Sequence, residues 1–102
     1  MILITKEIKN KIPKLYEQDG KGSAAVVYLK LFTPDGGWTG YFTEFDGEDT
    51  LFGWAGNGEK EMGYSSLSEI QGVRGHLGLP IERDKWFTPT TLGEIKANEC
   101  RH

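Results

Sequence analysis

Four carboxylates lie close together in the middle of this 102-residue chain, and of all its residues they come nearest to a chemical site. Such a cluster could hold a divalent cation, contact a basic partner, or only keep a turn soluble. The calcium loop of an EF-hand needs a fixed ligand spacing that is absent here. The sequence leaves the three alternatives open for this cluster, which consists of Glu44, Asp46, Glu48 and Asp49.

Other catalytic or metal-binding patterns are missing from the sequence. Nucleophilic catalysis needs a Ser, Cys or Thr with a base in reach, but His76 is the only histidine inside the expected fold, and Cys100 lies near the end. One cysteine and two histidines are too few for a structural zinc site. The GKGS stretch at residues 20–23 lacks the spacing of a phosphate-binding loop. We therefore expect a protein that is not an enzyme and that uses no cofactor or metal.

A second polar segment follows later in the chain and ends in a tryptophan. With catalysis disfavoured, we predict that this segment and the acidic cluster contact a partner. The predicted contacts in this segment are Glu82, Arg83, Asp84 and Trp86.

The acidic cluster is placed by a predicted β-hairpin over residues 38–57, two aromatic-rich runs on either side of Asp46-Gly47. Asp and Gly tolerate the positive φ of a tight turn. A two-residue turn would set Glu44 opposite Asp49, and like charges across a strand pair are destabilising. We therefore favour a four-residue loop.

The four-residue loop predicts which hairpin residues face each other. It pairs Phe45 with Thr50 and Tyr41 with Trp54. Side chains alternate along a strand, so two aromatic faces are expected. One face carries Tyr41, Phe45, Phe52 and Trp54, and the other carries Trp38, Phe42 and Leu51.

The remaining sequence predicts an α+β fold, with an antiparallel β-meander of three to five strands, an N-terminal helix and two short capped helices. Hydroxyl residues that open apolar helical patterns predict the helix starts. Short apolar runs between Gly-rich turns predict the strands. The predicted elements are a helix capped by Thr5 and ended by Pro13, strands over residues 24–32, 61–64 and 84–88, and helices capped by Ser66 and Thr91.

Composition narrows the class of protein. The chain is 37% hydrophobic and 12% aromatic, which is typical of a globular domain, and its length fits one domain over residues 1–102, with residues 98–102 as a frayed tail. A net charge of −3 gives no footprint for nucleic acid. A single cysteine forms no internal disulfide, and no run is long enough to cross a membrane. We expect a cytoplasmic protein without membrane contact.

Several stretches resemble a domain-of-unknown-function family of small bacterial proteins from plasmids, integrative conjugative elements and phages. They are residues 3–22 (LITKEIKNKIPKLYEQDGKG) and the pieces TEFDGED at 43–49 and LGLPIERD at 77–84. The resemblance implies an accessory protein of a mobile element. Such proteins act in transfer, in DNA maintenance, or against host defences such as restriction and CRISPR. The family carries no established activity to assign to residues.

Two functions follow as expectations. The first is a non-enzymatic mobile-element protein that binds another protein, such as a host defence nuclease or a transfer protein, and inhibits an anti-phage defence in the anti-CRISPR or anti-restriction sense. The alternative is a nucleic-acid-binding accessory protein of plasmid transfer or maintenance, which uses the lysine-rich first helix and Trp86. The sequence does not set the oligomeric state.

Overall fold

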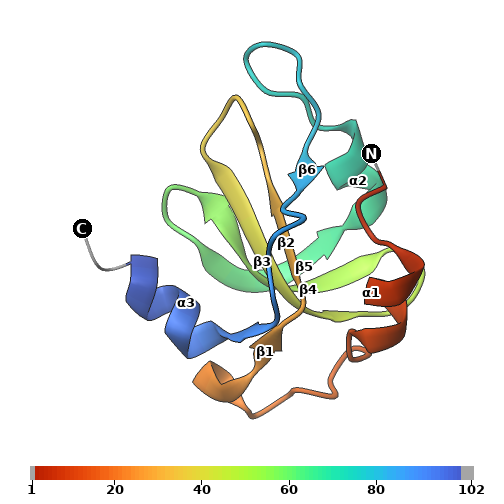
Figure 1. Ribbon diagram of the computed structural model, residues 1–102, viewed down its shortest axis with the longest axis vertical. Coiled ribbons are helices and arrows are strands. Elements are labelled where there is room, and N and C mark those ends of the chain that lie inside the picture. The colour runs from red at the N-terminus through yellow and green to blue at the C-terminus, as the bar shows by residue number, and fades with distance from the viewer. Residues whose placement is uncertain (1, 100–102) are drawn as a thin grey trace.

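An antiparallel sheet of five strands forms the centre of the computed structural model, which describes residues 2–99. The strands are β2 (Leu29–Phe32), β3 (Trp38–Phe45), β4 (Thr50–Asn57), β5 (Glu61–Ser66) and β6 (Glu82–Arg83). Their order is β5-β4-β3-β2-β6, so β2 to β5 form the predicted meander and β6 joins its edge (Figure 1). The α+β fold class is confirmed.

Three α-helices accompany the sheet: α1 (Lys6–Lys11), α2 (Leu67–Gly72) and α3 (Leu92–Glu99). Each follows a hydroxyl residue whose oxygen accepts a hydrogen bond from an N–H of the first turn, as predicted. The bonds run from Ile8 N to Thr5, from Glu69 N to Ser66 and from Glu94 N to Thr91. A short 3-10 helix, η1 (Gly22–Ala24), precedes the first strand.

The predicted strand over residues 24–32 is divided at Tyr28. Its first part, β1 (Val26–Val27), pairs with β7 (Thr90–Thr91) in a separate two-stranded sheet, and its second part is β2. The chain therefore links the main sheet to the start of α3, because Leu92 N donates to the carbonyl of Ala25.

The strand predicted at residues 84–88 is wrong. Pairing with β2 occurs two residues earlier, in β6, and Asp84 N makes the last bond, to the carbonyl of Lys30. Asp84 then starts a turn, since its Oδ1 accepts from Trp86 N at 2.9 Å and its carbonyl from Phe87 N. An Asp side chain that bonds the backbone two residues on favours a turn over a strand.

The hairpin has the longer loop that the charge argument favoured, because β3 ends at Phe45 and β4 begins at Thr50. Tyr41 pairs with Trp54 as predicted, but Phe45 pairs with Leu51. The register shifts between Phe42 and Glu44, which makes Thr43 an extra residue on β3. Such a β-bulge reverses the alternation of side chains beyond it.

The predicted face of Phe45 is therefore wrong. The bulge puts Phe45 on the same side as Phe42 and Leu51, away from Tyr41. A Cβ on Gly53, which pairs with Phe42, would overlap the carbonyl of Tyr41. Only glycine allows the two strands to approach this closely at the bulge.

Two separate hydrophobic cores result, one on each face of the sheet. The larger core lies under α1 and α2, and the smaller core lies under α3. The larger core contains Leu3, Ile12, Leu29, Leu31, Phe42, Phe45, Leu51, Ile70 and Ile81, and the smaller contains Val27, Tyr41, Leu92 and Ile95. None of the helices in residues 2–99 has the length and apolar character needed to cross a membrane.

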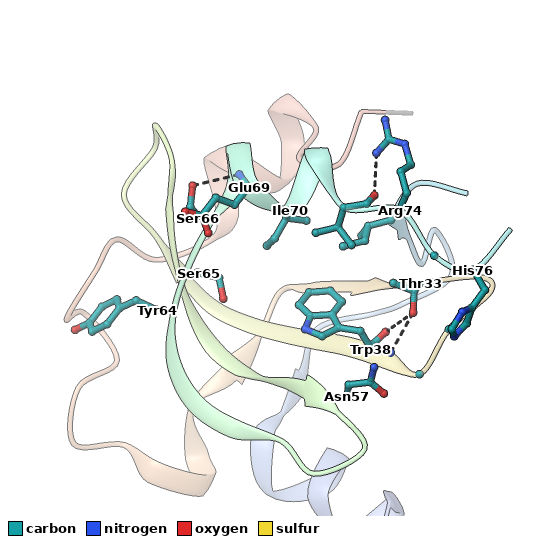
Figure 2. Close-up of a pocket in the computed structure, with 15 residues that line it drawn as sticks. Thr33, Trp38, Asn57, Tyr64, Ser65, Ser66, Glu69, Ile70, Arg74 and His76 are labelled. Atoms are coloured by element: carbon teal, nitrogen blue, oxygen red, sulfur yellow. Dashed lines mark hydrogen bonds between the residues drawn. The ribbon is translucent and has the colours of Figure 1, made fainter. Parts of the chain in front are cut away.

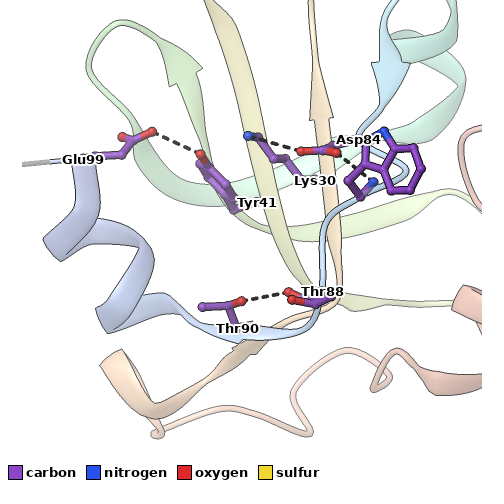
Figure 3. Close-up of polar contacts among 7 residues, drawn as sticks. Lys30, Tyr41, Asp84, Thr88, Thr90 and Glu99 are labelled. Carbon is purple, nitrogen blue, oxygen red and sulfur yellow. Dashed lines mark hydrogen bonds and ion pairs between the residues drawn. The ribbon is translucent and has the colours of Figure 1, made fainter.

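The end of α3 is fastened to the sheet. Glu99 accepts a hydrogen bond from Tyr41 Oη at 3.2 Å (Figure 3) and another from Lys60 Nζ at 3.0 Å. Residues 98 and 99 of the predicted frayed tail are thus helical, and residues 100–102 lie outside the described part. Burial, followed by the charge and hydrogen bond of Glu99, raises the pKa of Tyr41 to about 12.

We predict that Tyr41 ionises later than an ordinary tyrosine in an alkaline titration. Its folded-state pKa of about 12 lies above the ordinary value of 10.0, so the unfolded chain loses this proton first. The free energy of unfolding should therefore fall as the pH rises from about 10 to about 12. Absorbance at 295 nm should show a tyrosine that titrates near pH 12 and is missing from the Tyr41→Phe variant.

The Glu99→Gln variant is the matched control for that titration. It removes the negative charge but leaves the burial, so the late transition should move to lower pH without reaching the ordinary tyrosine value. If the Tyr41→Phe variant instead lost a tyrosine that titrates near the ordinary value, the late transition would not belong to Tyr41.

Candidate functional site

Glu44 does not belong to an exposed acidic patch, because only 4% of its surface is accessible. Its Oε1 accepts from the backbone N–H of Tyr16 and its Oε2 from that of Gln18, both at 2.8 Å. The carboxylate therefore has a structural use. The sequence prediction placed it at the tip because the bulge at Thr43 could not be foreseen.

Asp46 and Asp49 also serve the fold. Asp46 Oδ1 accepts from the backbone N–H groups of Glu48, Asp49 and Thr50, and the first two bonds are the main reason why its pKa is lowered. Asp49 Oδ2 accepts from Ser66 Oγ at 2.6 Å, which is the main reason why its pKa is lowered too. Asp49 Oδ1 accepts from Ser68 N, so this carboxylate holds the start of α2.

Glu48 is thus the one member of the cluster without such a structural bond among residues 2–99, and it is exposed. Within the same described range, no three or more acidic, histidine or cysteine side chains are grouped so that they could hold a metal ion. The structure therefore separates Glu44 from the predicted cluster and commits Asp46 and Asp49 to bonds within the fold.

The second predicted segment lies beside β2, at the edge of the sheet. Asp84 Oδ2 pairs with Lys30 Nζ at 3.5 Å (Figure 3), and the guanidinium of Arg83 donates to the carbonyl of Ile2. Glu82 is half-buried within β6, whereas Trp86 is 92% exposed. Because the tip contacts α2 and this segment borders β2, the structure does not bring the two predicted groups together.

A cleft of about 660 Å³ lies elsewhere, between the sheet and α2 (Figure 2). We call it the main cleft. Its volume falls in the range of ligand and peptide sites. The side chains that give it chemical character come from three strands, one helix and one loop: Trp38, Asn57, Ser65, Glu69, Ile70 and His76.

Trp38 forms the apolar floor of the main cleft. Its backbone is fixed on both sides by Thr33, whose Oγ1 accepts from Trp38 N at 3.0 Å and whose N–H donates to the Trp38 carbonyl. Its ring lies 6.4 Å from that of Phe42, at the border of the larger core. In Figure 2 the indole lies in the cleft between Ser65 and Asn57. The floor is therefore a fixed aromatic surface.

A loop of unusual composition forms one rim of the main cleft. This apolar loop, residues 73–80, connects α2 to β6 and projects from the body of the protein (Figure 1). Leu77 is 80% exposed, and Val73 and Leu79 are each 42% exposed. Clustered exposed aliphatic side chains of this kind mark interaction surfaces more often than solvated loops.

The apolar loop is held in one conformation by Asp35, in the turn between β2 and β3. Asp35 Oδ2 accepts from Leu77 N at 2.7 Å and from Leu79 N at 3.4 Å. The loop closes on itself through Gly75 N to the Leu79 carbonyl and Gly78 N to the Gly75 carbonyl, both at 3.0 Å. A Cβ on Gly75 would overlap the Asp35 carboxylate, so glycine is needed there.

Within residues 2–99, the main cleft contains no serine that is hydrogen-bonded to a histidine. Among residues 2–99, His76 makes no hydrogen bond with a cleft side chain, and Figure 2 shows it across the cleft from Ser65. A serine nucleophile needs a base within hydrogen-bond reach. Arg74 Nη1 donates hydrogen bonds to the carbonyls of Gln71 and Val73 at the end of α2.

Sequence reasoning missed the apolar loop, although a signal was present. The stretch at residues 74–83 reads as irregular, since Gly75, Gly78 and Pro80 interrupt it. Leucines at 77 and 79 in a glycine-interrupted loop cannot belong to a regular apolar face. The sequence alone did not show that Ile81 is buried while both leucines remain outside.

Comparison with known proteins gives one result. A family model described as a protein of unknown function, DUF2958, matches residues 3–97. No curated protein and no solved structure matches the chain.

We predict that Glu44→Gln lowers the free energy of unfolding by about 3 kcal/mol, because one of two buried backbone N–H groups would face the new amide NH₂ instead of an acceptor. Urea unfolding measures the change. Glu48→Gln removes the same charge four residues away on an exposed side chain and should stay within about 0.5 kcal/mol of the wild type. Equal losses in the two variants would contradict the structural role of Glu44.

Proposed function

Because the chain belongs to DUF2958, a family of proteins of unknown function, its role must be inferred from its own surface, and we propose that it is a non-enzymatic protein that binds another protein through the apolar loop and the main cleft. One observation carries this proposal. Two exposed leucines, Leu77 and Leu79, are held by hydrogen bonds in a loop whose residues 73–76 line one side of a cleft with an aromatic floor.

The rigidity of the loop supports a binding role. A free loop would have to lose conformational entropy on binding, and this cost weakens association. In this protein the loss of conformational entropy on binding is smaller, because the loop is already ordered. One carboxylate oxygen of Asp35 accepts from the two backbone N–H groups that flank Gly78. Burial of an exposed Leu side chain in a partner contributes about 1.5–3 kcal/mol.

The hydrogen bonds that three carboxylates of the hairpin accept support the non-enzymatic part of the proposal. Glu44, Asp46 and Asp49 each accept hydrogen bonds that stabilise the chain's own backbone or caps. Groups committed in this way are poor candidates for proton transfer to a substrate.

We extend the proposal to an accessory protein of a mobile element that acts in the bacterial cytoplasm. In this role the partner would be a host defence nuclease, inhibited in the anti-CRISPR or anti-restriction sense, or a transfer protein. The support is the sequence resemblance of residues 3–22, 43–49 and 77–84, together with an apolar loop whose residues 77–80 lie in the last of these stretches.

Nucleic acid binding is the second candidate, favoured by a groove of about 340 Å³ between α1 and the segment after β6. Lys11, Lys30, Arg83 and Lys85 line this groove beside the exposed Trp86. Two of these cations are already paired, Lys11 with Glu7 at 3.0 Å and Lys30 with Asp84. The positive charge left for phosphate is small, so this candidate ranks below protein binding.

We predict that Leu77→Ser weakens capture of the partner by about tenfold or more, because the contact loses most of a buried leucine. The measurement compares proteins retained from host lysate by the tagged wild type and by the variant, and then the affinity of the retained protein. Ile2→Ser is the matched control, since Ile2 is 72% exposed and belongs neither to the apolar loop nor to the lining of the main cleft.

Asp35→Ala tests the preorganisation of the loop. It leaves all leucines in place but releases Leu77 N and Leu79 N, so binding should also weaken. A partner that binds the wild type, Leu77→Ser and Asp35→Ala equally would contradict the proposed surface.

The second candidate predicts that a fluorescein-labelled oligonucleotide binds with an affinity that falls steeply with salt and that Lys85→Glu abolishes. Fluorescence anisotropy measures the affinity. Absence of binding at low salt would remove nucleic acid from consideration.

A further inference from the structure

A second pocket lies on the other face of β5 from the main cleft. Its volume is about 390 Å³, and its walls include three aromatic rings, those of Tyr16, Phe52 and Tyr64. Figure 2 shows Tyr64 pointing away from the main cleft, whereas its neighbour Ser65 lies on the cleft side. β5 is an edge strand of the sheet, so within residues 2–99 no further strand pairs along its outer edge. We call this site the aromatic pocket.

The three rings are held close to one another and remain open to solvent. The rings of Phe52 and Tyr64 have centroids 4.9 Å apart and an interplanar angle of 52°. Tyr64 and Tyr16 are 58% and 67% exposed. The neighbouring hydroxyl of Tyr16 is the main cause of the raised pKa of Tyr64.

Tyr16 occupies its place at a conformational cost. Its φ is 73°, and it is the only residue other than glycine with a positive φ in residues 2–99. A glycine would adopt this conformation without steric strain. The backbone is kept there by Glu44, which accepts from Tyr16 N at 2.8 Å. Strain that surrounding structure maintains is a feature of functional positions, so the ring at this position is a candidate for a binding role.

The charge around the aromatic pocket favours a cation. Two carboxylates line it, those of Asp19 and of the buried Glu44. The one cation in its lining is Lys96, whose Nζ lies 5.3 Å from the ring centroid of Trp54 and is thus engaged there. The faces of aromatic rings attract cations, and a guanidinium group stacks on them especially well.

We propose that the aromatic pocket binds the guanidinium group of an arginine side chain presented by a partner protein. Stacking on Tyr16 and Tyr64 would supply the contact area, and the field of Asp19 and Glu44 would supply the charge preference. The site is separate from the apolar loop, so it goes beyond the proposed function and is tested without the partner of that loop.

The test uses the full chain and a small probe, acetyl-Gly-Arg-Gly-amide, followed by ¹H–¹⁵N NMR. The amides of Gly20, Gly22 and Gly63 report on the site, since the first two line the pocket and the third lies in β5 next to Tyr64. Their signals should shift in a saturable way at about millimolar peptide. The same peptide with citrulline in place of arginine has the same shape but no charge and should cause no saturable shift.

Three variants distinguish the loss of an aromatic ring from the loss of the folded structure. Tyr16→Gly removes one ring at a position where glycine relaxes the backbone, so the protein should stay folded while the peptide affinity falls about tenfold. Tyr64→Leu should have a similar effect. Tyr64→Phe keeps the ring face and should change the affinity by less than about threefold.

Equal binding of the arginine and citrulline peptides would overturn the proposal, because the charge would then play no part. Shifts confined to residues 46–49 would overturn it as well, since they would place the peptide at the hairpin tip. A folded Tyr16→Gly variant with unchanged affinity would exclude the stacked geometry.

Discussion

The buried carboxylate of Glu44 is the interaction on which the rest of the structure depends. It accepts from two backbone N–H groups of the segment after α1 and so fixes that segment to the sheet. Gln18, which it holds, completes the connection: its side chain bonds both polar backbone groups of Val26 and the carbonyl of Thr43. A buried polar network of this kind specifies one arrangement, because an unmet donor in the interior is costly.

The same network lies at the β-bulge that organises both faces of the sheet. With Thr43 as the extra residue, Phe42 and Phe45 share the larger core while Tyr41 points into the smaller one. The strands approach closely here because Gly53 has no side chain. One local irregularity therefore provides two cores, and it allows α1 and α2 to pack on one face and α3 on the other.

The two proposed binding surfaces lie on different faces of the sheet. On the larger-core face, the turn between β2 and β3 supplies Asp35, which holds two exposed leucines in the loop that borders the main cleft. On the other face of β5, the segment fixed by Glu44 brings Tyr16 next to Tyr64. In each case a carboxylate that bonds backbone N–H groups positions apolar or aromatic side chains that remain exposed. The acids of this chain thus act mainly through the backbone.

Local signals in the sequence determined the helix starts at Thr5, Ser66 and Thr91, the turn at Asp46-Gly47 and the meander, because caps, turns and alternation depend on residues a few positions apart. Only the tertiary structure decided which carboxylates are free. The sequence predicted Glu44 and Asp49 as surface contacts, but their hydrogen-bond donors lie 28 and 19 positions away along the chain. The exposure of Leu77 and the proximity of Tyr16 to Tyr64 could not be predicted from neighbouring residues either, since both depend on contacts between segments that are distant in sequence.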